Sequence, residues 1–166
     1  VHLAQIAALE RYADSRCLTR FGYRCTSQNE EDGILDEIFH RIGTTNRSFV
    51  EFGVGPGLEN NTLSLLLGGW SGLWIEADGS HARRSRGGFA EPLASGRLRL
   101  LEELVTAENV EALFEEGRVP TEPDLLSIDI DGNDYWVWKA VRRFRPRVIV
   151  IERANAADTS VYVVTM

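Results

Sequence analysis

The chain has 166 residues, of which 43% are apolar and 26% are charged; this is typical of one globular domain and excludes a disordered chain. Its 25 acidic residues outnumber its 18 basic residues, so it lacks the basic surface that general binding to nucleic acid requires. No stretch approaches the roughly 18 apolar residues that span a bilayer, and residues 1–6 lack the basic flank of a signal peptide. We therefore expect no nucleic-acid or membrane partner.

The two cysteines, Cys17 and Cys25, are spaced like neither a zinc site nor a redox pair. Two cysteines in a chain of this length do not indicate a disulfide-based scaffold. We interpret them as free thiols in a reducing compartment, and we expect a cytoplasmic protein.

Residues 1–47 are predicted to form an N-terminal helical extension. Apolar residues within positions 3–9 indicate a short first helix. Ser27 is the predicted N-cap of a second helix, which carries acidic residues in its first turn, where the helix dipole favours them. Apolar residues at helical spacing follow from Ile34 to Ile42, and Gly43 ends the pattern.

Residues 48–166 are predicted to form an α/β domain, because short apolar strands alternate with helices after Gly43. Strands with near-continuous apolar runs indicate a parallel sheet covered on both faces. The pattern predicts a doubly wound, mostly parallel Rossmann-like sheet whose ligand lies at the carboxyl ends of the strands. The predicted strands are 48–52, 73–76, 97–101, 125–130 and 148–151; the predicted helices are 60–67, 106–117 and 134–144.

A glycine-rich loop, Glu51-Phe-Gly53-Val-Gly55-Pro-Gly57, follows the first predicted strand. Glycines at alternate positions let the backbone turn sharply and approach a ligand closely. The dinucleotide fingerprint does not fit, because its third glycine would fall on Leu58, and no Gly-Lys-Ser/Thr of a phosphate-binding P-loop follows. An enzyme that uses a nicotinamide cofactor is therefore disfavoured.

Four segments together resemble the FkbM-type methyltransferases, a group of class I S-adenosylmethionine-dependent enzymes. They are Ser27-Gln-Asn-Glu-Glu-Asp-Gly33, Val50–Thr62 around the glycine loop, Leu126-Ser-Ile-Asp-Ile-Asp-Gly-Asn-Asp134 and Arg145-Pro-Arg-Val-Ile-Val-Ile-Glu152. The resemblance implies S-adenosylmethionine as cofactor and, in most members with an assigned acceptor, methylation of hydroxyl oxygens of sugars or natural products.

The resemblance also implies roles for individual residues. The glycine loop, with Glu51, Gly53, Gly55 and Gly57, would line the methionine and ribose portions of the cofactor. Glu76 would hold the ribose, since a carboxylate can accept hydrogen bonds from two neighbouring hydroxyls. Ala77 and Asp78 would flank the adenine. Asn60, Asn61 and Thr62 would either bond the cofactor carboxylate or cap the following helix.

Three aspartates, Asp129, Asp131 and Asp134, crowd the end of the fourth predicted strand. Like charges this close need a positive partner, a metal or a proton. Asp129 or Asp131 could be the general base that takes the acceptor proton. Alternatively, Asp131, Glu152 and Asn155 could bind a divalent cation, although we do not expect a metal. A third interpretation is a strand-to-helix turn with a cap.

The function predicted from the sequence is transfer of a methyl group to a hydroxyl of a small molecule or sugar. An alternative is a non-catalytic or partner-dependent cofactor-binding module. It arises because methyltransferases of this class usually have seven strands, and the residues after Glu152 could supply at most one, 160–165. His81 is a further candidate base, and Trp136 and Trp138 are predicted to pack in the core. The sequence does not indicate an oligomeric state.

Overall fold

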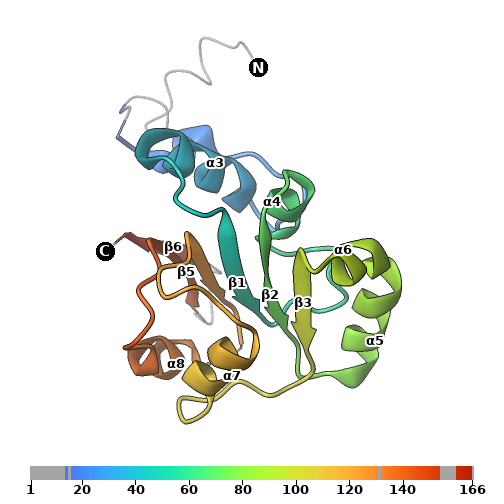
Figure 1. Ribbon diagram of the computed structural model, residues 1–166. Coiled ribbons are helices and arrows are strands. Elements are labelled where there is room, and N and C mark those ends of the chain that lie inside the picture. The colour runs from blue at the N-terminus through green and yellow to red at the C-terminus, as the bar shows by residue number, and fades with distance from the viewer. Residues whose placement is uncertain (1–13, 15, 131, 154–159, 166) are drawn as a thin grey trace.

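A single sheet with helices around it forms the centre of the molecule (Figure 1). The computed structural model describes residues 14, 16–130, 132–153 and 160–165. The expected first helix within residues 3–9 lies outside these ranges. The helical elements are η1 (Leu18–Phe21), α3 (Glu31–Ile42), α4 (Leu63–Leu67), α5 (Gly79–Gly88), α6 (Ala90–Ser95), α7 (Val110–Glu116) and α8 (Asp134–Ala140); the strands are β1 (Ser48–Phe52), β2 (Ser71–Ile75), β3 (Leu98–Leu101), β4 (Leu125–Ile128), β5 (Val148–Arg153) and β6 (Ser160–Thr165).

The strand order in the sheet is β3-β2-β1-β4-β5-β6. Strands β1 to β5 pair in parallel, and β6 pairs antiparallel to β5. The order reverses between β1 and β4, which makes their carboxyl ends the switch point where ligands bind in open α/β sheets. The predicted doubly wound, mostly parallel sheet is confirmed, and residues 160–165 supply the one additional strand.

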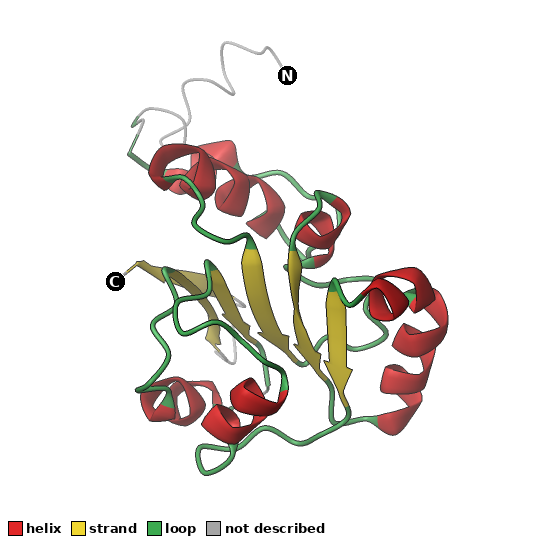
Figure 2. Cartoon of the chain, viewed as in Figure 1, coloured by secondary structure: helices red, strands yellow, loops and turns green. Residues whose placement is uncertain are grey.

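Two apolar clusters cover the two faces of the sheet, because alternate residues of each strand point to opposite sides. Phe49 of β1 and Trp74 of β2 belong to one cluster with α3 and α4. Val50 and Leu73 belong to the other cluster with α7 and α8. All five residues of β1 are buried, as expected for a central strand covered on both faces. Figure 2 shows the helices distributed around the sheet. No helix in the described part of the chain is long and apolar enough to cross a bilayer.

The second helix begins later than the sequence predicts. Helix α3 starts at Glu31, and Ser27 is not its N-cap. Ser27 is fully buried, and its backbone N–H and its Oγ both donate to Asp32 Oδ2 at 2.8 Å. The Asp32 carboxylate, in the first turn of α3, binds the residues that precede the helix. Residues 27–30 therefore lie outside α3.

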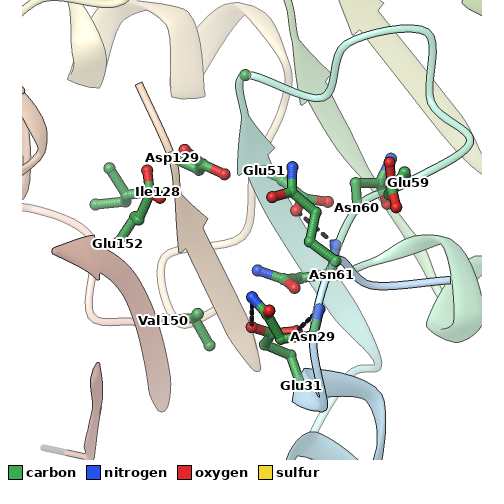
Figure 3. Close-up of a pocket in the computed structure, with 12 residues that line it drawn as sticks. Asn29, Glu31, Glu51, Glu59, Asn60, Asn61, Ile128, Asp129, Val150 and Glu152 are labelled. Carbon is green, nitrogen blue, oxygen red and sulfur yellow. Dashed lines mark hydrogen bonds between the residues drawn. The ribbon is translucent and has the colours of Figure 1, made fainter. Parts of the chain in front are cut away.

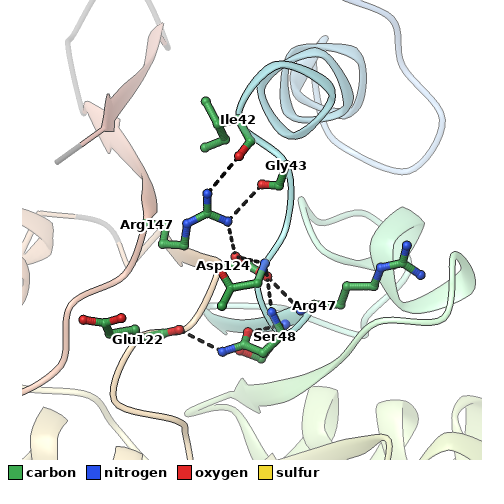
Figure 4. A network of polar contacts seen from close by, with 9 residues as sticks. Ile42, Gly43, Arg47, Ser48, Glu122, Asp124 and Arg147 are labelled. Carbon is green, nitrogen blue, oxygen red and sulfur yellow. Dashed lines mark hydrogen bonds and ion pairs between the residues drawn. The ribbon is translucent and has the colours of Figure 1, made fainter.

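A buried carboxylate fixes the connection between α3 and β1 (Figure 4). Asp124, which precedes β4 and is 0% exposed, accepts the backbone N–H groups of residues 45, 46 and 47 at 2.7–2.9 Å. Arg147 donates to Asp124 at 2.7 Å and to the carbonyls of Ile42 and Gly43. The connection is thereby bonded to the starts of β4 and β5. The domain boundary at residue 47 stays a prediction.

Other boundaries differ from the predicted ones for local reasons. Helix α4 begins at Leu63 instead of residue 60, because the Asn60 side chain accepts the N–H groups of Thr62 and Leu63. Strand β4 ends at Ile128 instead of residue 130, because the Ile130 N–H donates to Asp134.

The prediction for the two tryptophans of α8 is half right. Trp138 packs against one apolar cluster, whereas Trp136 is 57% exposed and contacts Tyr135 edge to face. The helix buries a single stripe around Val137, and position 136 faces away from it. Both cysteines are free, as the sequence predicts.

Candidate active site

The glycine loop after β1 brings the backbone of β1 against that of β4. Gly53 has φ +69°, and a Cβ there would lie 1.9 Å from the carbonyl oxygen of Asp129. Gly57 has φ +78°, and its Cβ would meet the rings of Trp74 and Phe89. Gly55 also has a positive φ, but its Cβ direction is open. Two of the glycines therefore allow close packing, and the third leaves free space beside the loop.

Glu76 lies directly after β2 and bonds two loops at once. Its side chain is 6% exposed, and it accepts the Gly55 N–H at 2.7 Å and the Asp78 N–H at 2.8 Å. These bonds fix the carboxylate beside the glycine loop. The residue also lines a cleft, so it presents a positioned acceptor to a ligand there.

Two adjoining hollows occupy the carboxyl ends of the strands. The larger, of about 420 Å³, extends over Glu76, Ala77, His81 and residues 103–105. The smaller, of about 30 Å³, lies among Glu31, Glu51, Asn60 and their neighbours. In Figure 3, Asp129 and Glu152 lie across the smaller pocket from Glu51, Asn60 and Asn61. Four residues line both hollows: Gln28, Gly53, Asp129 and Glu152.

Glu51 is a buried carboxyl group of the smaller pocket, and protein groups already satisfy it. It is 2% exposed and accepts the N–H groups of Asn61 at 2.8 Å and Thr62 at 3.1 Å. The hydroxyls of Thr62 and Ser127 also donate to it. Burial raises the pKa of Glu51 to about 7, against the opposing effect of these hydrogen bonds. Glu51 thus holds the loop over residues 61–62 in place.

Residues 60–62 have different roles beside the smaller pocket. Thr62 connects Glu51 to the Trp74 indole, which donates to its Oγ1 at 2.8 Å. The Asn61 amide donates to Ser127. The side-chain oxygen of Asn60 accepts the N–H of Leu63, the first residue of α4. Its Nδ2 is buried with no hydrogen-bond partner in the described part of the protein. Because Asn60 is 6% exposed and lines the smaller pocket, it offers this pocket a donor.

Ala77 and Asp78 differ in what they contact. Ala77 lines the larger hollow. Asp78 is the N-cap of α5, and its side chain accepts the N–H groups of Ser80 and His81. Glu103, Leu104 and Val105, which follow β3, and His81 also line the larger hollow.

The aspartate-rich segment after β4 contributes one described carboxylate to the junction of the two hollows, Asp129. Asp134 instead forms the turn, since it accepts the N–H groups of Ile130 and Gly132 at 2.9 Å. Asp131, a candidate base and metal ligand, lies outside the described residues. Asn155, a candidate metal ligand, lies outside them as well. Among the residues that the structure does describe, no three His, Cys, Asp or Glu side chains are grouped to hold a metal ion.

The residues of the smaller pocket that the sequence analysis missed include Gln28, Asn29 and Glu31, which all precede β1. They lie in the segment 27–33 that carries part of the family resemblance, but their pattern predicts only a helix start. No local pattern indicates that this segment lines the same pocket as the ends of β4 and β5.

Comparisons with known proteins identify the family and the fold. The FkbM methyltransferase domain family matches residues 36–161. No curated protein sequence matches the chain. Among solved structures, the putative methyltransferase yhhF from Escherichia coli is similar at 12% identity and TM-score 0.51, covering 74% of this chain and 67% of that one. A precorrin-6y C5,15-methyltransferase from Geobacter metallireducens is similar at 15% identity and TM-score 0.51, covering 81% and 68%.

The fold is that of the class I S-adenosylmethionine-dependent methyltransferases. More particularly, the chain belongs to the FkbM methyltransferase domain family. The name of the second neighbour gives a precorrin as acceptor and that of the first gives none; at 12% and 15% identity, both indicate architecture and not substrate.

Proposed function

We propose that the protein transfers a methyl group from S-adenosylmethionine to a hydroxyl oxygen of a small molecule, with a carbohydrate as the favoured acceptor. The observation that carries this proposal is the pair of adjoining hollows at the switch point of the sheet, joined at Gly53, Asp129 and Glu152. A volume of about 420 Å³ lies within the range of small-molecule sites.

The residues present fit the two ends of this cofactor. In the larger hollow, Glu76 is a fixed carboxylate suited to the ribose diol. Ala77 and residues 103–105 of the same hollow would flank the adenine. In the smaller pocket, the unpartnered Asn60 Nδ2 would donate to the cofactor's carboxylate. The nearby carboxyl group of Glu31 would suit its ammonium, and Glu51 would support this pocket indirectly through its bonds to Asn61 and Thr62. Asp78, the N-cap of α5, would contribute indirectly by fixing the start of that helix.

Asp129 is our choice for the group that accepts the acceptor's proton. It lines both hollows at the end of β4, and a base must be within hydrogen-bond reach of the proton it takes. When bound, S-adenosylmethionine supplies an electrophilic methyl group on its sulfonium. The protein's larger contribution would be to hold the two reactants in line. Asp131 stays an alternative base, and a divalent cation on Asp131, Glu152 and Asn155 stays the less favoured alternative.

The test is a thermal melt with S-adenosylmethionine, S-adenosylhomocysteine, NAD and no ligand. At 100 times its dissociation constant, a ligand adds about 2.7 kcal/mol, which raises the midpoint of a chain this size by roughly 5–10 °C. We expect this rise with the two adenosyl ligands and not with NAD.

Glu76→Ala and Glu76→Gln should both abolish the rise, because each removes the carboxylate that would hold the ribose. Glu116→Ala, which removes an exposed carboxylate of α7, is the matched control and should keep it. A rise with NAD alone, or no rise in the wild type, would contradict the proposal. A rise followed by no turnover on any hydroxylated acceptor would favour a non-catalytic cofactor-binding module.

A further inference from the structure

Gln28 lies at the junction of the two hollows although it precedes the first strand by 20 residues in the chain. The other three residues that line both hollows come from the ends of β1, β4 and β5. Gln28 also precedes the region that matches the family, residues 36–161. A segment outside the matched domain therefore contributes to the centre of the candidate site.

Two carboxylates of α3 hold the residues on either side of Gln28. Asp32, 3% exposed, accepts the N–H groups of Cys25, Thr26 and Ser27 on one oxygen at 2.7–2.8 Å. Glu31, 6% exposed, accepts the backbone and side-chain N–H groups of Asn29 at 2.8 and 3.1 Å. Hydrogen bonds to charged groups are among the stronger ones in proteins. The backbone that carries Gln28 is thus bonded on both sides.

The same segment is bonded to the loop that carries Asn60. The Thr26 carbonyl accepts the Asn60 N–H at 2.9 Å, and Thr26 Oγ1 accepts the Ser64 N–H at 3.1 Å. These bonds set the position of Gln28 relative to the glycine-loop side of the site. Gln28 is exposed, so its amide, with one acceptor oxygen and two donor N–H groups, is accessible to a ligand.

We infer that Gln28 contacts the cofactor where it passes from the larger to the smaller hollow, and that Asp32 is the positioning residue that places it there. This inference rests on the proposed function. Gln28 supplies an uncharged side chain with both donor and acceptor groups at the junction that Asp129 and Glu152 also line. Because Gln28 lines both hollows where they join, a ligand that crosses the junction meets it, and a ligand held at the Glu76 end of the larger hollow should depend on it less.

Titration calorimetry with two probes tests the inference. In the proposed binding mode, S-adenosylhomocysteine would extend through both hollows, and adenosine would occupy only the Glu76 end of the larger one. Gln28→Ala should weaken S-adenosylhomocysteine by about 3- to 10-fold, as expected for one lost hydrogen bond, and leave adenosine unchanged within about 2-fold. Asp32→Asn should show the same selective loss, while Asp36→Asn, an exposed aspartate one turn later on α3, should not.

The ratio of the two affinities separates positioning from general damage to the fold. If Asp32→Asn does not fold, Ser27→Ala removes the two hydrogen bonds between the Ser27 hydroxyl and Asp32 and should give a smaller loss of the same kind. Equal weakening of both probes by Gln28→Ala, or no weakening of either, would overturn the inference. If the wild type bound neither probe, the proposed function itself would fail, and this result is distinct from the others.

Discussion

The stability of the protein should depend on pH through the ionisation of Glu51. This carboxyl group is buried beneath residues 61–62, and burial raises its pKa to about 7 from an ordinary value of 4.5. An acid with a raised pKa in the folded state adds a stability that is fully present below the unfolded pKa. That stability is lost as pH rises through the folded pKa. The loss should therefore begin above pH 4.5 and be complete above pH 7.

The size of the effect follows from the two pKa values. Each pKa unit is worth 1.36 kcal/mol, so ionisation of Glu51 should cost the folded state about 3 kcal/mol by pH 8. For a chain of this length, that corresponds to a fall of roughly 6–12 °C in the melting midpoint. Glu51→Gln keeps the shape of the side chain but cannot ionise, so it should not show this fall.

Urea unfolding of the wild type and Glu51→Gln at pH 5 and pH 8 measures the effect. The free energy of unfolding of the variant, relative to that of the wild type, should rise by about 2–3 kcal/mol between the two pH values. Other titrating groups, such as Asp32 and Asp124, are present in both proteins and cancel in the difference. Parallel pH profiles for the two proteins would refute the argument that Glu51 titrates near neutrality.

Three further substitutions test the packing around the site. Asp124→Ala should cost about 3–5 kcal/mol in urea unfolding, because it leaves Arg147 and three backbone N–H groups without their buried acceptor; a loss under 1 kcal/mol would contradict the network. Gly53→Ala should abolish S-adenosylhomocysteine binding in calorimetry, since its Cβ would collide with the Asp129 carbonyl; wild-type affinity would show that the loop can adjust. Trp136→Ala should change the melting midpoint little, because the side chain is 57% exposed; a large fall would place that ring in the core.

Local sequence patterns were sufficient for the architecture and for part of the site. Apolar runs flanked by turn residues identify all five parallel strands, and the bounds of β1 match exactly. The acidic residue after β2 and the glycines after β1 follow from the same strand pattern. The strands needed only the local contrast between apolar and polar residues, because each is buried on both faces.

The remainder of the site depends on contacts between residues far apart in the chain. Glu51 bonds residues 10, 11 and 76 positions away, and these bonds decide that it supports the pocket wall. Ser27 has the residue type of an N-cap, but the buried Asp32 draws three preceding N–H groups to itself. The exposure of Trp136 depends on which stripe of α8 meets the sheet. None of these outcomes can be derived from spacing alone.

The central position of β1 in the sheet sets the order in which the protein can be assembled. Residues 48–52 pair with 71–75 on one side, but on the other side residues 49–51 pair with 125–127, which are 76 positions later in the chain. Closing such a long loop costs entropy before any contact compensates for it, and long-range parallel pairing folds slowly. During synthesis, both walls of the site at Gly53 and Asp129 can meet only after β4 has emerged from the ribosome. The cofactor can therefore stabilise the finished sheet but cannot guide the early steps of folding.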